Sequence, residues 1–419
     1  MTFRAVFVLV VLSAEVVARN VTCRKPSTSA ESLIQSRKVN EKFLKYSCSP
    51  SSKVDHHLCP QGTGIGNIFE IYPALYTFAL LDGRSIVIGD SSEIGMFCQV
   101  LNCGFPFASE VESSFPVLKN KSHLRHGHAF FSKYFQDATM EDESVLLPSG
   151  LSTVASNWYQ YTGQNATRSC IESITGCAFG SVGCVERYAY RQLFPGGLRQ
   201  NVEPSEVHGL SEGEYKAFLT QPYDSVRRFD ATIHIRAQMA HLETKNERAT
   251  VDIADAVQYY ATVIFPAFSD KLTDYFYKSP DTKDSWRALS NASLSDPPRV
   301  FISCDDVVLK TALVSLLHRR PVEYPIIPVY VNGSRIVHMK YHNTLKGTVT
   351  VDQSVVDTAF DWYAMSLGNV LFAYRKGATK MFSTFAQTAM RVSLENRKTG
   401  KIFMLTSHNK WRAVWDWPE

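Results

Sequence analysis

The stretch FDATIHIR, residues 229–236, decides the fold. Its apolar residues alternate with polar ones and it closes on an arginine, as expected for a strand that ends at the polar edge of a sheet. Two further runs predict strands, at 299–303 and 326–331, and an apolar segment follows at 369–374. Helical patterns lie between them, at about 252–268, 307–317 and 358–367. This alternation predicts an α/β domain with a mostly parallel, Rossmann-like sheet over residues 226–395, followed by a tail at 396–419.

A second α/β pattern precedes this domain. The sequence QGTGIGNIFEIYPALYTFALLDGRSIVIGD, residues 61–90, reads as a glycine-rich turn, an amphipathic helix, a break at Asp82 and Gly83, and a strand at 85–88. A chain of 419 residues is long enough for two domains. We therefore predict an N-terminal α/β domain over 56–225, with irregular, acceptor-facing structure between 91 and 225.

The N-terminus predicts entry into the secretory pathway. An apolar run between Ala5 and Ala14 follows Arg4, and it is too short for a comfortable membrane span. A signal peptide over 1–19 is the preferred interpretation, with a short anchor as the alternative, and the polar segment 20–55 is expected to be a stem. N-x-S/T sequons agree with a lumenal chain, and they occur at Asn20, Asn120, Asn165, Asn291 and Asn332.

Cysteine usage points to the same compartment. Of nine cysteines, eight lie before residue 190, so disulfides are expected to staple the N-terminal half, with connectivity left open. The ninth, Cys304, lies in an apolar strand and is expected to be a buried thiol. No CxxC pair supports zinc. The net charge of +4 and the absence of a long Lys/Arg run give no reason to expect a nucleic-acid partner.

Polar residues that close two of the strands are candidate ligand contacts, because open parallel sheets bind ligands beyond the carboxyl ends of their strands. His234 and Arg236 close the first strand, and an arginine there can donate two hydrogen bonds to a phosphate. If the strand merely alternates on a sheet face, both would point to solvent. Asp305 and Asp306 close the next strand, where they could bind a base or ribose, although one of them is expected to cap the following helix.

Two further motifs resemble phosphate cradles. Ser383, Thr384 and Phe385 lie at a predicted strand-to-helix junction, where hydroxyls and backbone N–H groups can bind phosphate or simply cap the helix. Gly64 and Gly66, in GTGIGN, form a weak nucleotide-binding motif, since no clear strand precedes them.

In order, these motifs resemble the superfamily of α1,2-, α1,6- and protein O-fucosyltransferases. The matching pieces are GIGN, HIR, SCDD, DWYAMSLGNVLF and STFAQTAMRVSLE, and the last two are most similar to the α1,6 branch. The resemblance covers residues 62–90 and 230–395. It implies a GT-B-like fold, in which two Rossmann-like domains face each other across a cleft, and a GDP-fucose donor.

The resemblance also implies roles for individual residues. Arg236 would bind the donor β-phosphate, and His234, with Asp305 or Asp306, would hold ribose or guanine. Ser383, Thr384 and Phe385 would line the diphosphate and base pocket. Asn67, with Gly64 and Gly66, would approach donor and acceptor from the facing domain.

The chain departs from the α1,6 pattern after Arg236. Ala237, Gln238 and Met239 stand where that branch continues R-x-D, so a basic residue that could assist the leaving diphosphate is missing. Glu243 is the candidate general base, with His241 and Glu70 as alternatives.

The sequence thus predicts a metal-independent, inverting fucosyltransferase of the Golgi or ER lumen, or a secreted one. It would act on a glycan or glycoprotein, with Arg236, Glu243 and Asn67 as candidate catalytic residues and no cofactor. Two alternatives stay open: a related transferase that uses another nucleotide sugar, and a catalytically inactive member that binds carbohydrate or protein. Neither G-x-S-x-G nor H-E-x-x-H is present to favour a hydrolase.

Overall fold

A computed structural model places most of both halves of the chain. It describes residues 21–29, 43–46, 65–90, 93–107, 109–110, 164–178, 181–237, 257–279, 296–332, 351–375, 383–393, 401–406 and 408–413. The predicted signal peptide and most of the sequons lie outside these residues.

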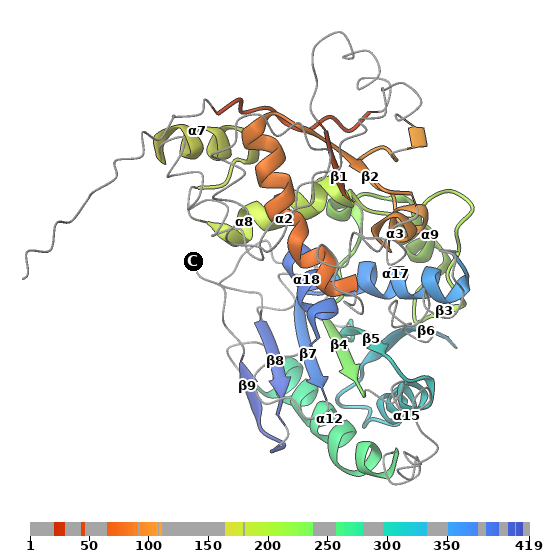
Figure 1. Ribbon diagram of the computed structural model, residues 1–419. Coiled ribbons are helices and arrows are strands. Elements are labelled where there is room, and N and C mark those ends of the chain that lie inside the picture. The colour runs from red at the N-terminus through yellow and green to blue at the C-terminus, as the bar shows by residue number, and fades with distance from the viewer. Residues whose placement is uncertain are drawn as a thin grey trace, which may run out of the picture.

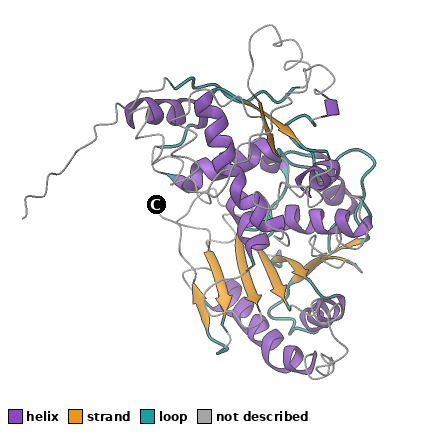
Figure 2. Ribbon diagram, in the orientation of Figure 1, coloured by secondary structure: helices purple, strands orange, loops and turns teal. Residues whose placement is uncertain are grey.

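One mixed sheet organises the C-terminal half (Figures 1 and 2). In the described residues it has seven strands in the order β3-β6-β5-β4-β7-β8-β9. The five inner strands are parallel, and the two edge strands pair antiparallel. The strands are β3 (Val207–His208), β4 (Ala231–Arg236), β5 (Arg299–Cys304), β6 (Ile327–Val331), β7 (Val370–Arg375), β8 (Lys401–Leu405) and β9 (Trp411–Ala413). The predicted α/β class and the strands of FDATIHIR and RVFISC are confirmed.

The order in which the chain adds strands to this sheet reverses after β6, with β4 as the starting strand. From β4 the chain proceeds through β5 to β6 on one side, and then returns to place β7 and β8 on the other side. Such a reversal opens a crevice beyond the carboxyl ends of the two strands that flank it, because their connections leave in opposite directions. Here the crevice is expected beyond the ends of β4 and β7.

Helices cover both faces of the sheet (Figure 1). One face packs against a long helix interrupted by two π-helical segments, and against α15. The other packs against α17 and α18. These elements are η5 (Tyr260–Ile264), α12 (Phe265–Thr273), η6 (Asp274–Lys278), α15 (Val307–His318), α17 (Gln353–Met365) and α18 (Thr384–Ser393). The three predicted helices are confirmed, and the first of them continues ten residues beyond its predicted end at 268, to Lys278.

The N-terminal half is mainly helical in the described residues. A two-stranded parallel sheet joins β1 (Phe43–Tyr46) to β2 (Ser85–Ile88). The remaining elements are α2 (Ile65–Asp82), α3 (Glu93–Val100), α7 (Gln164–Thr175), α8 (Val182–Leu193), α9 (Glu212–Thr220) and η3 (Tyr223–Ser225).

The expectation of irregular structure between 91 and 225 was therefore wrong for the described part. The described helices there, from α3 to α9, have only 8 to 12 residues each, so the helical period repeats too few times to be recognised. For α9 a usable signal was present, because Ser211 and Glu214 form a capping box at its start.

The helices of the two halves share one apolar core. The ring of Phe69 in α2 lies 4.8 Å from that of Trp362 in α17, and Phe194, just after α8, lies 5.1 Å from the same indole. The hydroxyl of Tyr190 donates to the Phe69 carbonyl over 2.7 Å. This packing fixes the N-terminal helices over one face of the C-terminal sheet.

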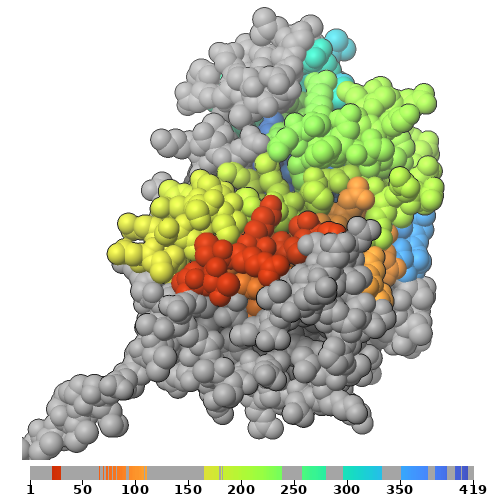
Figure 3. Space-filling view, turned by 90° about the horizontal axis from the view of Figure 1, so that it is seen from above, coloured from red at the N-terminus to blue at the C-terminus, as the bar shows by residue number. Residues whose placement is uncertain are grey.

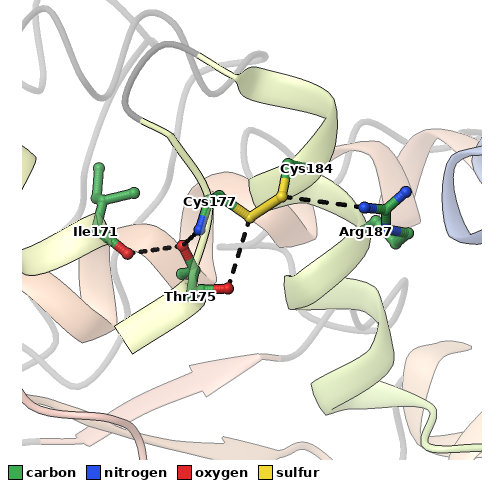
Figure 4. The surroundings of a disulfide bond; sticks show 5 residues. All are labelled: Ile171, Thr175, Cys177, Cys184 and Arg187. Carbon is green, nitrogen blue, oxygen red and sulfur yellow. Dashed lines mark hydrogen bonds between the residues drawn. A yellow bond between two sulfur atoms is a disulfide. The ribbon is translucent and has the colours of Figure 1, made fainter. Parts of the chain in front are cut away.

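Disulfides staple the N-terminal half, as predicted. Cys23 pairs with Cys170, Cys98 with Cys103, and Cys177 with Cys184 beside Thr175 (Figure 4). Cys304 is a free, buried thiol, which confirms the expectation for that residue.

Residues 21–29, which were predicted to belong to a stem, are bound to the N-terminal helices. The backbone N–H groups of Thr22 and Arg24 donate to the carbonyls of Leu81 and Leu80 at the end of α2. Figure 3 shows this segment in red beside the yellow residues of α7, to which the disulfide of Cys23 ties it.

The predicted C-terminal tail at 396–419 was wrong as well. Residues 401–405 pair in parallel with β7, and 411–413 pair antiparallel with β8. The tail therefore extends the sheet by two strands.

No helix within the described residues is long and apolar enough to cross a membrane.

Candidate functional site

Strand β4 directs its candidate residues toward α17 and α18. Ile233 and Ile235 belong to the core on the opposite face, so His234 and Arg236 face the α17–α18 side by alternation. His234 is only 2% exposed, and Arg236 is half-buried. The alternative that both side chains point to solvent is therefore wrong for His234.

Arg236 reaches the start of α18. Its Nη1 donates to Oγ of Ser383 over 3.4 Å, and Ser383 is buried immediately before the helix begins at Thr384. The first turn of α18 contains no acidic residue. The first backbone N–H groups of a helix have no intrahelical partner and favour negative charge, so this end of α18 suits an anion.

His234 lies behind this arginine. Its Nδ1 is 3.4 Å from Oγ of Ser303 on β5, and its ring centroid is 6.1 Å from that of Phe385. Burial, reinforced by the charge of Arg236, lowers the pKa of His234 to about 3. The imidazole is therefore neutral near pH 7. Its buried Nε2 makes no hydrogen bond with a described residue, although buried polar atoms usually have a partner.

A buried carboxylate to which the sequence motifs gave no role lies on α17, at the first residue of the matched segment DWYAMSLGNVLF. Asp361 is fully buried, and neither of its oxygens makes a hydrogen bond of ordinary geometry within the described structure. Burial raises its pKa to about 7, and the charge of Asp357 adds to the rise, while Lys310 and the hydroxyl of Ser303 oppose it. Since Ser303 also contacts His234, two under-satisfied polar groups lie on the same side of the sheet.

The two adjacent aspartates have separate tasks. Asp306 is the N-cap of α15 and accepts from the N–H of Leu309 over 2.9 Å, which confirms the expected capping role for one of the pair. Oδ1 of Asp305 accepts from the N–H of Ala237 over 2.7 Å and ties the end of β5 to the end of β4.

The glycine motif meets α18 directly. A Cβ added to Gly66, in the first turn of α2, would lie 2.3 Å from the backbone nitrogen of Phe385. The structure therefore brings Gly66 together with Thr384 and Phe385, which follow Ser383 directly. Gly64 lies outside the described residues, and Asn67 lies within α2 with its side chain undescribed.

The candidate general bases are not placed. Glu243 and His241 fall outside the described residues, and Glu70 lies in α2 with its side chain undescribed. The described residues contain no group of three or more His, Cys, Asp or Glu side chains that could hold a metal ion.

Arg375 is a second residue to which the sequence motifs gave no role. It ends β7 as Arg236 ends β4, and the two residues are paired in the register of these neighbouring strands. A sequence signal existed, because VLFAYR and ATIHIR are both apolar strand patterns that close on arginine.

The arrangement combines two kinds of binding surface. Arg236 and the N-terminus of α18 suit a phosphate, and the neutral His234 with the buried Asp361 suits a planar group rich in hydrogen-bond donors. Together they have the chemistry of a nucleotide site at the reversal point of an α/β sheet.

No family model matches this chain, and no curated protein matches it. Solved structures that align with it include the NodZ α-1,6-fucosyltransferase co-crystallized with GDP and the fucosyltransferase NodZ from Bradyrhizobium. Each aligns at 12% identity and a TM-score of 0.37, over 90% of this chain and 99% of the other. A mutant of Arabidopsis thaliana FUT1 in complex with GDP aligns at 12% identity and a TM-score of 0.41, over 90% of this chain and 74% of that one. At these values the likeness carries no argument about activity, and the α/β class rests on the sheet described above.

Proposed function

We propose that this chain is a glycosyltransferase that moves fucose from GDP-fucose to a glycan or glycoprotein acceptor, with inversion and without a metal ion. The observation that carries the proposal is the contact of Arg236 with Ser383 at the start of α18, at the reversal point of the sheet. His234 and Asp361 are both buried, and both interact with the hydroxyl of Ser303 on the neighbouring strand β5. The three disulfides within the described residues support a lumenal location.

The diphosphate is assigned to Arg236 and α18. As the bond between fucose and diphosphate breaks, negative charge grows on the departing oxygen, and preorganised donors stabilise it more than they stabilise the bound substrate. A guanidinium and helix N–H groups supply such donors without a metal ion. Ser383 orients the guanidinium through its hydroxyl.

The base is assigned to His234 and Asp361. Guanine presents N1–H and N2–H donors along one edge, and a carboxylate accepts two such bonds side by side. Adenine and uracil lack this pair of adjacent donors, so the buried carboxylate favours a guanine nucleotide. Because Asp306 is occupied as a helix cap, the predicted ribose or base contact falls to Asp305.

The acceptor side remains an expectation from the sequence. Glu243 stays the candidate base, and Asn67 would act from α2, whose first turn meets α18. The acceptor hydroxyl would lose its proton to the base as it attacks the sugar carbon from the face opposite the diphosphate.

A calorimetric titration tests the nucleotide assignment. We expect the unmodified chain to bind GDP at least tenfold more tightly than ADP or UDP, and to transfer labelled fucose from GDP-fucose to a member of a glycan array. Tighter binding of UDP or ADP would instead indicate a transferase with another nucleotide sugar.

A second candidate function is a binding module without catalysis. The observation that favours it is the absence of a basic side chain after Arg236, where Ala237 is buried and contributes only its N–H to Asp305. Slow hydrolysis of GDP-fucose to GDP in the absence of acceptor distinguishes the two, since a transferase releases GDP and a binding module does not.

A further inference from the structure

We propose that Arg375 is a second anion-binding residue of the donor site and that it holds the diphosphate together with Arg236. The identity of the anion rests on the proposed function. The presence of an anion site formed by the two arginines does not.

The strand register brings the two arginines together. Arg236 and Arg375 are direct partners in the parallel pairing of β4 with β7. Directly paired residues on neighbouring strands project from the same face of a sheet, and the strands lie about 4.8 Å apart. The shared face is the one toward α18. Leu371 and Ala373 lie four and two residues before Arg375 along β7, so they project from the same face as Arg375, and both belong to the core on the α18 side.

The two arginines lie at the reversal point of the sheet. The strands β4 and β7 are the two between which the chain reverses its course, and both arginines are the last residues of their strands. Ligands of open α/β sheets bind beyond the carboxyl ends at this point. Arg375 therefore lies at the same strand-end position as Arg236, beside the crevice that is expected there.

The charges around the two arginines favour an anion. Two like charges directly opposite each other destabilise a sheet, and an anion between them reverses the sign of that contribution. The start of α18, which Arg236 reaches through Ser383, adds the partial positive charge of a helix N-terminus with no acidic residue in its first turn. On the other side of β4, Asp305 directs Oδ1 to the N–H of Ala237. The two guanidinium groups and the start of α18 thus favour an anionic ligand at the reversal point.

The test measures anion binding with two probes, GDP and inorganic pyrophosphate, by calorimetry on the unmodified chain, on Arg375→Ala and on Arg375→Gln. Arg412→Ala is the matched control, because Arg412 lies on the edge strand β9 of the same sheet and is exposed. Unliganded melting checks the fold of each variant, and the glutamine variant replaces the alanine variant if the latter fails to fold.

We expect removal of the Arg375 charge to weaken both probes by roughly 10- to 100-fold, the range for one hydrogen bond to a charged group, with Arg412→Ala unchanged. If the Arg375 variants bind both probes like the unmodified chain, the inference is overturned while the proposed function stands. If the unmodified chain binds pyrophosphate but not GDP, and the Arg375 variants weaken it, the anion site stands and the proposed function falls. Binding of neither probe to the unmodified chain would overturn both.

Discussion

Gly66 and Phe385 lie against each other although 319 residues separate them, with so little room that a Cβ on Gly66 would stand 2.3 Å from the Phe385 nitrogen. Gly66 is the second residue of α2 in the N-terminal half, and Phe385 is the second residue of α18 in the C-terminal half. Two helix N-termini therefore converge beside the candidate phosphate site, and the contact depends on a residue without a side chain.

Replacing Gly66 with alanine should displace α2 from α18. The new methyl group meets backbone atoms, which cannot move aside as a flexible side chain can, so we expect a loss of roughly 1–3 kcal/mol in unfolding free energy and weaker GDP binding. Gly213→Ala is the control, since Gly213 lies in α9 with no atom within 4 Å of an added Cβ. Chemical denaturation should show the control unchanged or slightly stabilised. An equally harmless Gly66→Ala would contradict the close contact.

Asp361→Asn should stabilise the unliganded protein and weaken its affinity for GDP. The folded-state pKa of Asp361, about 7, lies above its ordinary value of 3.8, so the stability that this carboxyl contributes when protonated is lost as pH rises from about 4 through 7. The loss is at most roughly 4 kcal/mol. We expect the asparagine variant to melt higher than the unmodified chain at pH 8, with a gap that closes toward pH 4.

Calorimetry on the same variant separates a binding role from a purely structural one. Asparagine keeps one acceptor but loses the paired oxygens that guanine would use, so GDP affinity should fall as stability rises. Unchanged GDP affinity would show that Asp361 is not part of the base pocket.

Activity should survive chelation. Asp306 is used as a helix cap and Asp305 holds the N–H of Ala237, so neither carboxylate is arranged with the other to chelate a metal ion. We expect fucose transfer to be unchanged in EDTA. We also expect Asp306→Ala to lower stability by about 1 kcal/mol through the lost cap, with GDP binding retained. Loss of transfer in EDTA that manganese or magnesium restores would contradict the proposed mechanism.

Reduction should loosen the N-terminal half first. The described disulfides all lie before residue 190, and Cys23–Cys170 closes a sequence separation of 147 residues. Each bridge constrains the unfolded chain by roughly 2–4 kcal/mol. Limited proteolysis with reductant should cut the N-terminal half while the sheet from β4 to β8 stays protected. Cuts distributed equally over both halves would count against this picture.

Much of the C-terminal fold could be predicted because its strands are buried and end on polar residues. ATIHIR and RVFISC carry their own boundaries, and the carboxyl ends of neighbouring parallel strands must meet. Strands β8 and β9 were not recognised. The apolar run at 402–405 is short enough to fit a strand or a helical turn, and β9, with the sequence WRA, shows no apolar alternation.

The candidate site was predicted in part for a similar reason. His234, Arg236 and Ser383 stand in recognisable motifs, and the structure brings them together. Asp361 opens the matched segment DWYAMSLGNVLF but received no role, because the sequence does not show what an aspartate inside an apolar helix faces. Arg375 closes its strand as Arg236 does, but its pairing with Arg236 depends on strand register, which the sequence does not show.

The most direct test of the central claim is the release of GDP from GDP-fucose by the unmodified chain, Arg236→Ala and Arg236→Lys. Lysine keeps the charge but not the planar pair of donors, so both variants should be severely impaired, by roughly 10²- to 10³-fold. Their unliganded melting should be unchanged, because Arg236 is half-buried at a strand end and contributes little to the core. Release of GDP by the unmodified chain, with this loss in both variants, is the predicted result. No release by the unmodified chain, or equal release by all three, would contradict the account.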